Sequence, residues 1–533
     1  MPSFSFPLLD LPRKLRDAIY QQYVIVEGGY IYEFETGKLR AANDPEYFID
    51  LALMYTCKQV AREMKGMALG ANTITFRTLS CPELSFRASH FHGIMRTLIG
   101  AAGRLLELCD QRVLDEVARG FPECQPLLQL ARVVGQEESP SLTDQDRRDI
   151  LFLKLRDTMD ESIFDEDCWK EVPSVIRELL FEAIDTALEF GCPLPKERSS
   201  THPILPGDIL ELMSKFMPWA IPTPDEINYA IRKFDKERWT KNKTRKGKIC
   251  PFSAAAVAIK FLHDTPMSTR KHIRKIIVHE DRESVAYPQC HAEGFLPFCL
   301  ENSFLRIERR VNLWRAVVVG FEYIDSALGK QYENIHWSAE VGTWVVEAMD
   351  LRRAGMPREA FSLVFDGNPC PEYASKLFQR VQVDAAWQEA FDEACARRLF
   401  PLPSLGLKRI RGFYIREHFP KILRDMTNSE RFFIRCNFDI GSSRDIEPII
   451  SQNRTRSPCT WESFWKAETS DFDWTFMRKA GEALPLLNKA SYNSFVEAHI
   501  HPTERWRYAE EHVHDLESAF MEIPHRKTNC TFL

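Results

Sequence analysis

A cysteine and histidine cluster in the middle of the chain has the residue types that bind zinc. Cys290, His291 and Cys299 follow a C-H-x7-C pattern, and thiolate and imidazole are preferred zinc ligands. A structural zinc site needs four ligands, whereas adjacent side chains seldom reach one ion together and no fourth ligand lies nearby. We favour a buried thiol and a hydrogen-bonded histidine, and the sequence predicts no metal site and no cofactor.

Four further histidines, His499, His501, His512 and His514, lie close together near the end of the sequence. Residues two apart on a helix point to different sides, so each pair fits a strand or loop better than a helical ligand pair. We interpret this segment as solvated and polar, with a metal site as the alternative.

The sequence contains none of the compact catalytic motifs. It has no phosphate-binding GxxxxGK[ST], no GxGxxG after a strand, no HExxH and no GxSxG. Asp366, after the apolar FSLVFDG segment, is the type of strand-end carboxylate that an active site uses, although a turn with Gly367 is the simpler interpretation. Catalytic residues can be dispersed along a chain, so an enzyme with its site in a cleft of the central α/β body remains the alternative function, with no catalytic residue assigned.

A basic run lies between residues 232 and 248, and its stretch over 241–248 has no acidic residue to oppose the charge. It fits a solvated loop, a nuclear import signal or a phosphate contact. Few aromatic residues are interleaved with it, so the sequence gives no strong nucleic-acid signal. The candidate nuclear signal comprises Lys241, Lys243, Arg245, Lys246 and Lys248.

The last four residues match the C-a-a-X outline for prenylation of Cys530. Threonine and phenylalanine occupy the two central positions, where aliphatic residues are preferred, and one lipid gives only marginal membrane residence. A C-terminal prenyl anchor is therefore a secondary hypothesis, with an unmodified terminus as the alternative.

The first 80 residues are predicted to form a helix, hairpin, helix and strand unit. Pro12 lies in the first turn of a helix over 11–20, Asp10 can cap it, and Leu11, Leu15 and Ile19 share one stripe. Alternating residues after Gly28 predict a hairpin, a helix follows over 51–69, and NTITFRT over 72–78 predicts a strand.

The rest of the chain is predicted to be predominantly helical with a central mixed sheet backed by helices. Residues 81–224 read as a helical region, 225–400 as an α/β body with strands over 273–280 and 361–367, and 401–533 as an irregular, tryptophan-rich region. The predicted fold class is α+β.

Composition points to an intracellular protein, in the cytoplasm or nucleus. The net charge of −6 does not favour nucleic acid or anionic lipid, and the 14 scattered cysteines fit a reducing compartment. Charged residues interrupt the apolar start of the chain, unlike a signal peptide, and no apolar run reaches the roughly 20 residues of a transmembrane helix.

The N-terminal unit resembles the opening module of filamentous-fungal proteins described as F-box-like. The resemblance rests on Leu11-Pro12, Leu15-Arg16, Ile19-Tyr20, Thr56 to Gln59, Glu63 and Asn72 to Phe76. It extends to residues 251–262, 273–281 and 287–314 of the body. F-box proteins bind a Skp-type adaptor of a cullin ubiquitin ligase and recruit a substrate through their remaining residues. The resemblance implies that Leu11, Pro12, Leu15 and Ile19 lie near an adaptor surface.

Two interpretations of the N-terminal unit follow. It is either a cap packed on the remaining fold or a module that docks a partner. We expect a non-enzymatic protein-interaction protein, with a substrate-recruiting F-box-like subunit of a cullin-type ligase as the specific hypothesis.

Overall fold

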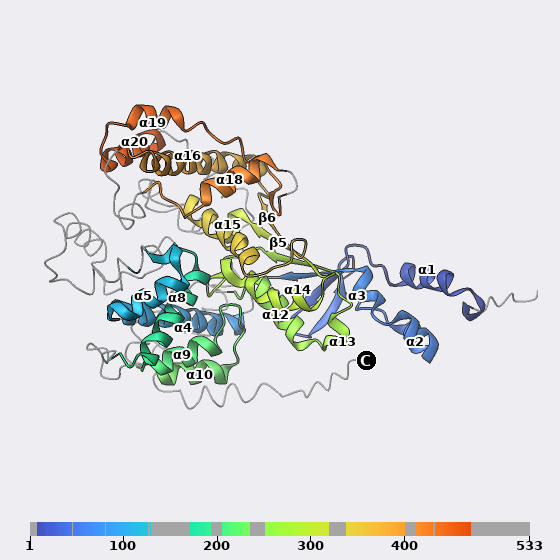
Figure 1. Cartoon of the computed structure of the whole chain (residues 1–533). Coiled ribbons are helices and arrows are strands. Elements are labelled where there is room, and N and C mark those ends of the chain that lie inside the picture. The colour runs from blue at the N-terminus through green and yellow to red at the C-terminus, as the bar shows by residue number, and fades with distance from the viewer. Residues whose placement is uncertain are drawn as a thin grey trace, which may run out of the picture. The chain divides into compact units, whose positions relative to one another are not determined.

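The computed structural model describes residues 8–44, 46–79, 82–125, 128, 171–192, 205–234, 251–318, 337–399, 412–429 and 432–470. Contacts divide the chain into two units, 1–478 and 479–533, and the described residues all belong to the first. This unit is α+β and predominantly helical, with a seven-stranded mixed sheet, so the predicted fold class is confirmed (Figure 1).

The N-terminal part of the chain alternates short helices with three strands. The hairpin predicted after Gly28 is present as β1 and β2, and its turn contains Gly37 with a φ of 66°. The elements are η1 (Leu8–Asp10), α1 (Arg13–Val24), β1 (Tyr30–Glu33), β2 (Lys38–Ala41), η2 (Ala52–Tyr55), α2 (Lys58–Met64), α3 (Met67–Ala71) and β3 (Thr73–Arg77).

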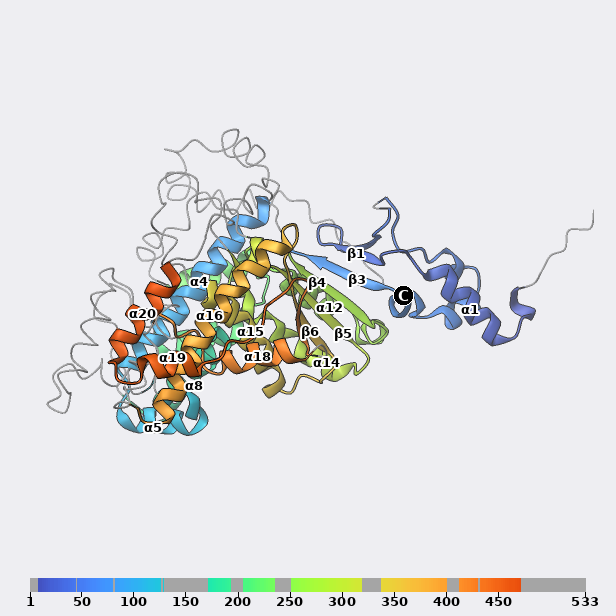
Figure 2. The same cartoon turned by 90° about the horizontal axis from the view of Figure 1, so that it is seen from above.

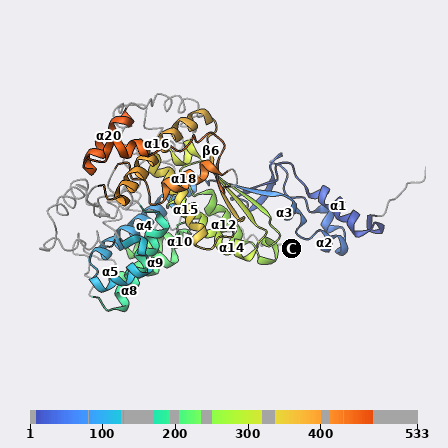
Figure 3. The same cartoon turned by 45° about the horizontal axis from the view of Figure 1, so that its top comes forward.

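A group of helices follows β3 and shares one hydrophobic core. Phe91, Leu179 and Leu212 are buried in that core, on three helices that pack together (Figure 3). The group comprises α4 (Pro82–Glu107), α5 (Gln111–Gly120), η3 (Pro122–Cys124), α8 (Pro173–Glu189), α9 (Pro206–Lys215) and α10 (Pro224–Lys233).

The α/β body begins with α12 (Ala254–Asp264), which Ser253 caps, because its side chain accepts a hydrogen bond from Ala256 N. Its elements are α13 (Met267–Arg270), β4 (Lys275–Glu280), η4 (Pro288–Phe295), α14 (Leu296–Glu301), β5 (Arg306–Asn312), the π-helical η5 (Leu313–Val317), α15 (Trp337–Arg353), β6 (Phe361–Asp366) and α16 (Pro371–Ala396).

The final described elements extend the sheet by one strand and add three helices. They are α18 (Phe419–Asn428), β7 (Ile434–Cys436), α19 (Glu447–Asn453) and α20 (Pro458–Ser470). Trp461 and Trp465 of α20 are buried against α16, in a cluster that includes Phe391 and Phe413.

The strands follow the order β2-β1-β3-β4-β5-β6-β7, and β1–β2 is the one antiparallel pair among them. The N-terminal hairpin and β3 therefore belong to the same sheet as the body, and β3 pairs directly with β4. Figure 2 shows β1 and β3 on the side of this sheet that is nearer to α1.

One face of the sheet is buried and the other is partly exposed. Burial alternates along β4, β5 and β6, so that Ile276, Ile307 and Leu363 are buried while Ile277, Glu308 and Val364 are half-buried. On the buried side, α12 packs on β3 and β4, and Glu280 at the end of β4 accepts hydrogen bonds from Ala254 N and Arg309.

Candidate protein interface on the N-terminal module

The helix α1 has an inner and an outer face. Its inner face carries Arg16, Tyr20 and Val24, all buried. Tyr20 and Val24 pack with Val60, Met64 and Ala68 in a small core that α1 shares with α2 and α3. We call α1, α2 and α3 the docking module. It has a core of its own, which fixes the direction of every side chain on α1.

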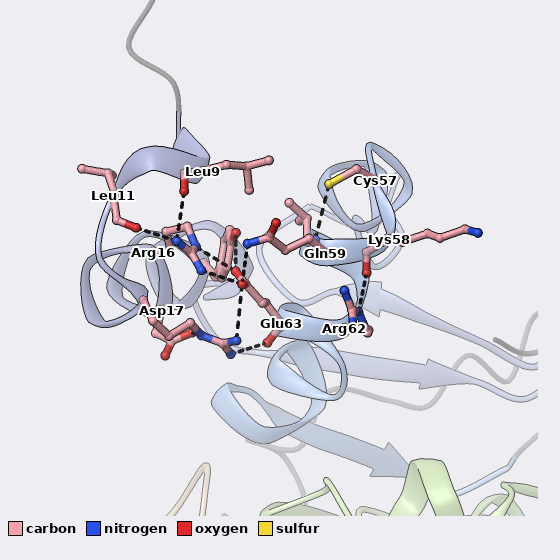
Figure 4. A network of polar contacts seen from close by, with 12 residues as sticks. Leu9, Leu11, Arg16, Asp17, Cys57, Lys58, Gln59, Arg62 and Glu63 are labelled. Atoms are coloured by element: carbon pink, nitrogen blue, oxygen red, sulfur yellow. Dashed lines mark hydrogen bonds and ion pairs between the residues drawn. The ribbon is translucent and has the colours of Figure 1, made fainter.

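A buried ion pair holds α1 against α2. The guanidinium of Arg16 donates two hydrogen bonds to the Glu63 carboxylate, from Nη2 to Oε1 at 2.6 Å and from Nε to Oε2 at 2.9 Å. The remaining Arg16 nitrogen donates to the carbonyl oxygens of Leu9 and Leu11, which ties the segment before the helix to the same site (Figure 4). This bidentate pairing fixes the position of α1 more strictly than apolar packing alone.

Neighbouring polar groups complete the coordination of Glu63. Tyr20 Oη donates to Oε2 at 2.9 Å, and Gln59 Nε2 donates to Oε1 at 3.1 Å. The hydrogen bonds from Arg16 lower the pKa of Glu63 to about 2, because they stabilise the ionised form. Burial raises the pKa of the Tyr20 phenol, so it stays a hydrogen-bond donor.

The helix that carries Glu63 is short, which corrects one sequence prediction. A single helix was expected over 51–69, but the chain forms η2, α2 and α3 there. Cys57 caps α2 by accepting from Val60 N, and Gly66, with a φ of 75°, ends it in the left-handed region that favours glycine. The reversal at Gly66 turns α3 back against α1.

The start of α1 also differs from the prediction. Pro12 is the residue before the first helical turn, and no side chain caps the helix. Asp10 lies in η1 and does not cap α1, because η1 is a separate turn that Arg16 holds through Leu9 O.

The outer face of α1 carries apolar side chains that contact solvent. Leu15 is 52% exposed, Ile19 42% and Tyr23 39%. They are four residues apart, so they form one row on the helix surface, which we call the docking stripe. Tyr23 Oη donates to Asp50 at 2.6 Å, and this bond fixes the end of the row.

The structure brings together the four residues predicted to bind a partner. Leu15 and Ile19 lie in the docking stripe, Pro12 is exposed one turn before it, and Leu11 is half-buried beside Pro12. Sequence reasoning missed Leu9, which is 42% exposed, and Tyr23. Helical spacing could have identified Tyr23, because it follows Ile19 by four residues.

The cysteine and histidine cluster is buried, and Cys290 and His291 are hydrogen-bonded. His291 is within 2.6 Å of Ser253 Oγ and 2.7 Å of Ala286 O, and Cys290 Sγ donates to Tyr287 O. Desolvation raises the pKa of Cys290, and it raises that of Cys299 to about 12. Within the described residues, no three metal-type ligands come together.

The Ser253–His291 pair is of the type that supports nucleophilic catalysis, but both residues are buried, with exposures of 0% and 1%. Burial lowers the pKa of His291 to about 3, so the ring is neutral and accepts from Ser253 while donating to Ala286 O. A substrate has no access to this pair as it stands, and its geometry serves the cap of α12.

Asp366 forms a local turn at the end of β6. Its Oδ1 accepts from Asn368 N at 3.0 Å and from Asn437 Nδ2 at 2.6 Å, while Gly367 N donates to Asn437. These bonds connect the end of β6 to the segment after β7 and use the carboxylate in the backbone turn.

Several predicted features lie outside the described residues. They are the basic residues Lys241, Lys243, Arg245, Lys246 and Lys248, the histidines from 499 to 514, and Cys530. Among the helices that the structure describes, none combines the length and apolar composition needed to cross a membrane.

Comparisons of the chain with protein-family models, with curated proteins and with solved structures find no match.

Proposed function

We propose that this protein is a non-enzymatic interaction protein that docks a partner protein through the docking stripe of α1. The observation that supports this proposal is the contrast between the two faces of the helix. One face is fixed by Arg16, Tyr20 and Glu63, and the other presents Leu15 and Ile19 to solvent. Because the core of the docking module does not include those two side chains, their exposure supports a role in binding.

The proposed partner is a Skp-type adaptor of a cullin ubiquitin ligase. The F-box-like resemblance of the first 80 residues supports this identity, because the motif residues divide between the two faces in a way that suits docking. Arg16, Tyr20 and Glu63 build the scaffold, while Leu11, Pro12, Leu15 and Ile19 lie at or near its outer surface. The remaining fold would then recruit the protein that is modified.

The proposal is tested by purifying the tagged chain from fungal extract and identifying a Skp-type adaptor and a cullin by mass spectrometry. The variant Leu15→Asp/Ile19→Asp should lose both. A matched control is Leu188→Asp/Leu300→Asp, which places the same charge on apolar side chains that are 43% and 62% exposed on α8 and α14. Either of two results would remove the proposal. The first is recovery of the ligase subunits with both variants, and the second is failure to recover them with the wild type.

The cellular location belongs to the same proposal, because a cullin-ligase subunit works in the cytoplasm or nucleus. Replacing Lys243, Arg245 and Lys246 by alanine should remove nuclear signal from a fluorescent fusion if the basic run directs import. The intact mass of protein from a eukaryotic host tests prenylation of Cys530, and an unmodified mass argues against the anchor.

A further inference from the structure

The parallel strands β3 to β7 have one face that the fold leaves partly uncovered. Parallel sheets are ordinarily buried on both faces, and their strands are then apolar throughout. Here the half-buried positions of the central strands include the polar residues Thr75, Glu308 and Ser362, which share one register row with Ile277 of β4 between Thr75 and Glu308. We call this surface the open face, and its composition calls for a functional explanation.

Positive charge is concentrated on the open face, although the whole chain has a net charge of −6. Arg77 and Lys275 are exposed, and neither has an ion-pair partner among the residues described. Glu308 lies between Arg310, at 2.5 Å, and Arg435, at 3.6 Å, so one carboxylate faces two guanidinium groups. The open face therefore retains unbalanced cations.

The excess of positive charge also affects the pKa of a histidine within this surface. His279 lies in register between Arg77 on β3 and Arg310 on β5. Burial lowers the pKa of His279, and the two arginines lower it further against the opposing effects of Asp281 and Asp366. Neighbouring cations disfavour a third positive charge at this position.

The cations extend across several strands in one register row. Arg77, Arg310 and Arg435 lie on β3, β5 and β7 and share the row with His279 and Val364. Adjacent strands are about 4.8 Å apart, so the row spans roughly 19 Å. An extended polypeptide advances about 3.3 Å per residue, which makes this span equal to about six residues.

We infer that the open face binds an extended acidic segment of a partner protein, with aspartate and glutamate side chains opposite Arg77, Arg310 and Arg435. The inference rests on the proposed function, because it gives the chemistry of the protein that the chain would recruit. Peptide is favoured over single-stranded nucleic acid because the positions of β3 to β7 on this face carry no phenylalanine, tyrosine or tryptophan for base stacking.

The test uses the purified full chain and a fluorescein-labelled decaglutamate peptide, followed by fluorescence polarisation at about 50 mM salt, where surface charges are weakly screened. The variant Arg77→Glu/Arg435→Glu, at two exposed positions of the row, should weaken peptide binding by at least about tenfold, or about 1.4 kcal/mol. The control Lys421→Glu/Arg454→Glu makes the same change in net charge at exposed positions on α18 and directly after α19, and it should bind as the wild type does.

Three results would overturn the inference. They are no measurable peptide binding by the wild type, equal weakening by the control variant, and tighter binding of labelled oligo(dT) than of decaglutamate under the same conditions. The adaptor takes no part in this assay, so failure here leaves adaptor docking unaffected, and loss of adaptor docking leaves the peptide result standing.

Discussion

At the scale of single residues, the carboxylate of Glu63 determines how the docking module is held together. Its folded pKa of about 2 lies below the ordinary 4.5, so the unfolded chain binds more protons between these values. The stabilisation is complete above pH 4.5 and is lost as the pH falls toward 2. We expect Glu63→Gln to lower the melting temperature at pH 7, with a difference from wild type that shrinks at pH 3. A constant difference across this range would contradict the role of the ion pair.

Glu347 on α15 makes the stability of the fold depend on pH in the opposite direction to Glu63. Its carboxylate is buried and accepts from Ser174 N at 3.0 Å and Ser174 Oγ at 2.8 Å. Desolvation raises its pKa to about 8, so the folded state holds the extra proton between pH 4.5 and 8 and stability decreases as the pH rises through that window.

We therefore predict that Glu347→Gln melts at a higher temperature than wild type at pH 8 and that this advantage declines toward pH 5. Each pKa unit corresponds to about 1.4 kcal/mol, so the difference should be measurable by calorimetry. An advantage that stays constant between pH 5 and pH 8 would show that the carboxylate is ionised in the fold throughout this range.

The sequence predicted the stripe on α1 but not which face of the helix is internal. Leu15 and Ile19 have the spacing of a core-facing pair, and their direction depends on Arg16, a residue type that is seldom buried without a partner. That partner, Glu63, is 47 residues away in the sequence. Hydropathy patterns contain no information about such a distant pair, so cap and docking module could not be distinguished.

At the scale of elements, Gly66 sets the angle between α2 and α3. Its φ is 75°, and a Cβ there would lie 2.1 Å from the His272 ring. Gly37 provides a matched control, because its φ is 66° and no atom lies within 4 Å of a Cβ. We predict that Gly66→Ala lowers stability by more than the roughly 1–2 kcal/mol that the backbone conformation alone costs.

Gly37→Ala should show that backbone cost by itself. Thermal unfolding of both variants measures the difference between them, which isolates the contact with His272. If the two variants lose the same stability, the contact at Gly66 contributes nothing and the turn alone explains the glycine.

The strands that sequence analysis identified are those with apolar residues. β4 and β6 were predicted because Ile276, Val278, Leu363 and Phe365 mark them, whereas β5 was missed because its sequence, RIERRVN, is highly charged. Arg309 of β5 is buried through its bond to Glu280, so a charged residue occupies a core position. The β7 strand has three residues and is too short for a periodic signal.

The predicted helix over 51–69 also shows what a hydrophobic pattern cannot predict. Its apolar spacing is helical throughout, but Cys57 and Gly66 divide it, and the deciding features are a cap and a left-handed φ. The fold class was accessible because helices and alternating strands give strong periodic signals. The breaks within a helical pattern depend on tertiary neighbours, such as His272 beside Gly66.

At the scale of the whole molecule, the docking stripe should contribute to binding and not to folding. Surface substitutions away from special features usually change stability by less than about 0.5 kcal/mol. We predict that Leu15→Asp/Ile19→Asp keeps the wild-type melting temperature and circular dichroism spectrum. A large fall in melting temperature would show that the stripe is covered in the folded chain and that α1 is a cap.

The most direct test of the central claim is a calorimetric titration of the purified chain with a purified Skp-type adaptor. We expect one-to-one binding by the wild type and by Leu188→Asp/Leu300→Asp. Removing the burial of two half-exposed apolar side chains costs roughly 2 kcal/mol, or about 30-fold in affinity, and the introduced charges add to this loss in Leu15→Asp/Ile19→Asp. Absence of binding by the wild type, or unchanged affinity in the stripe variant, would contradict the account.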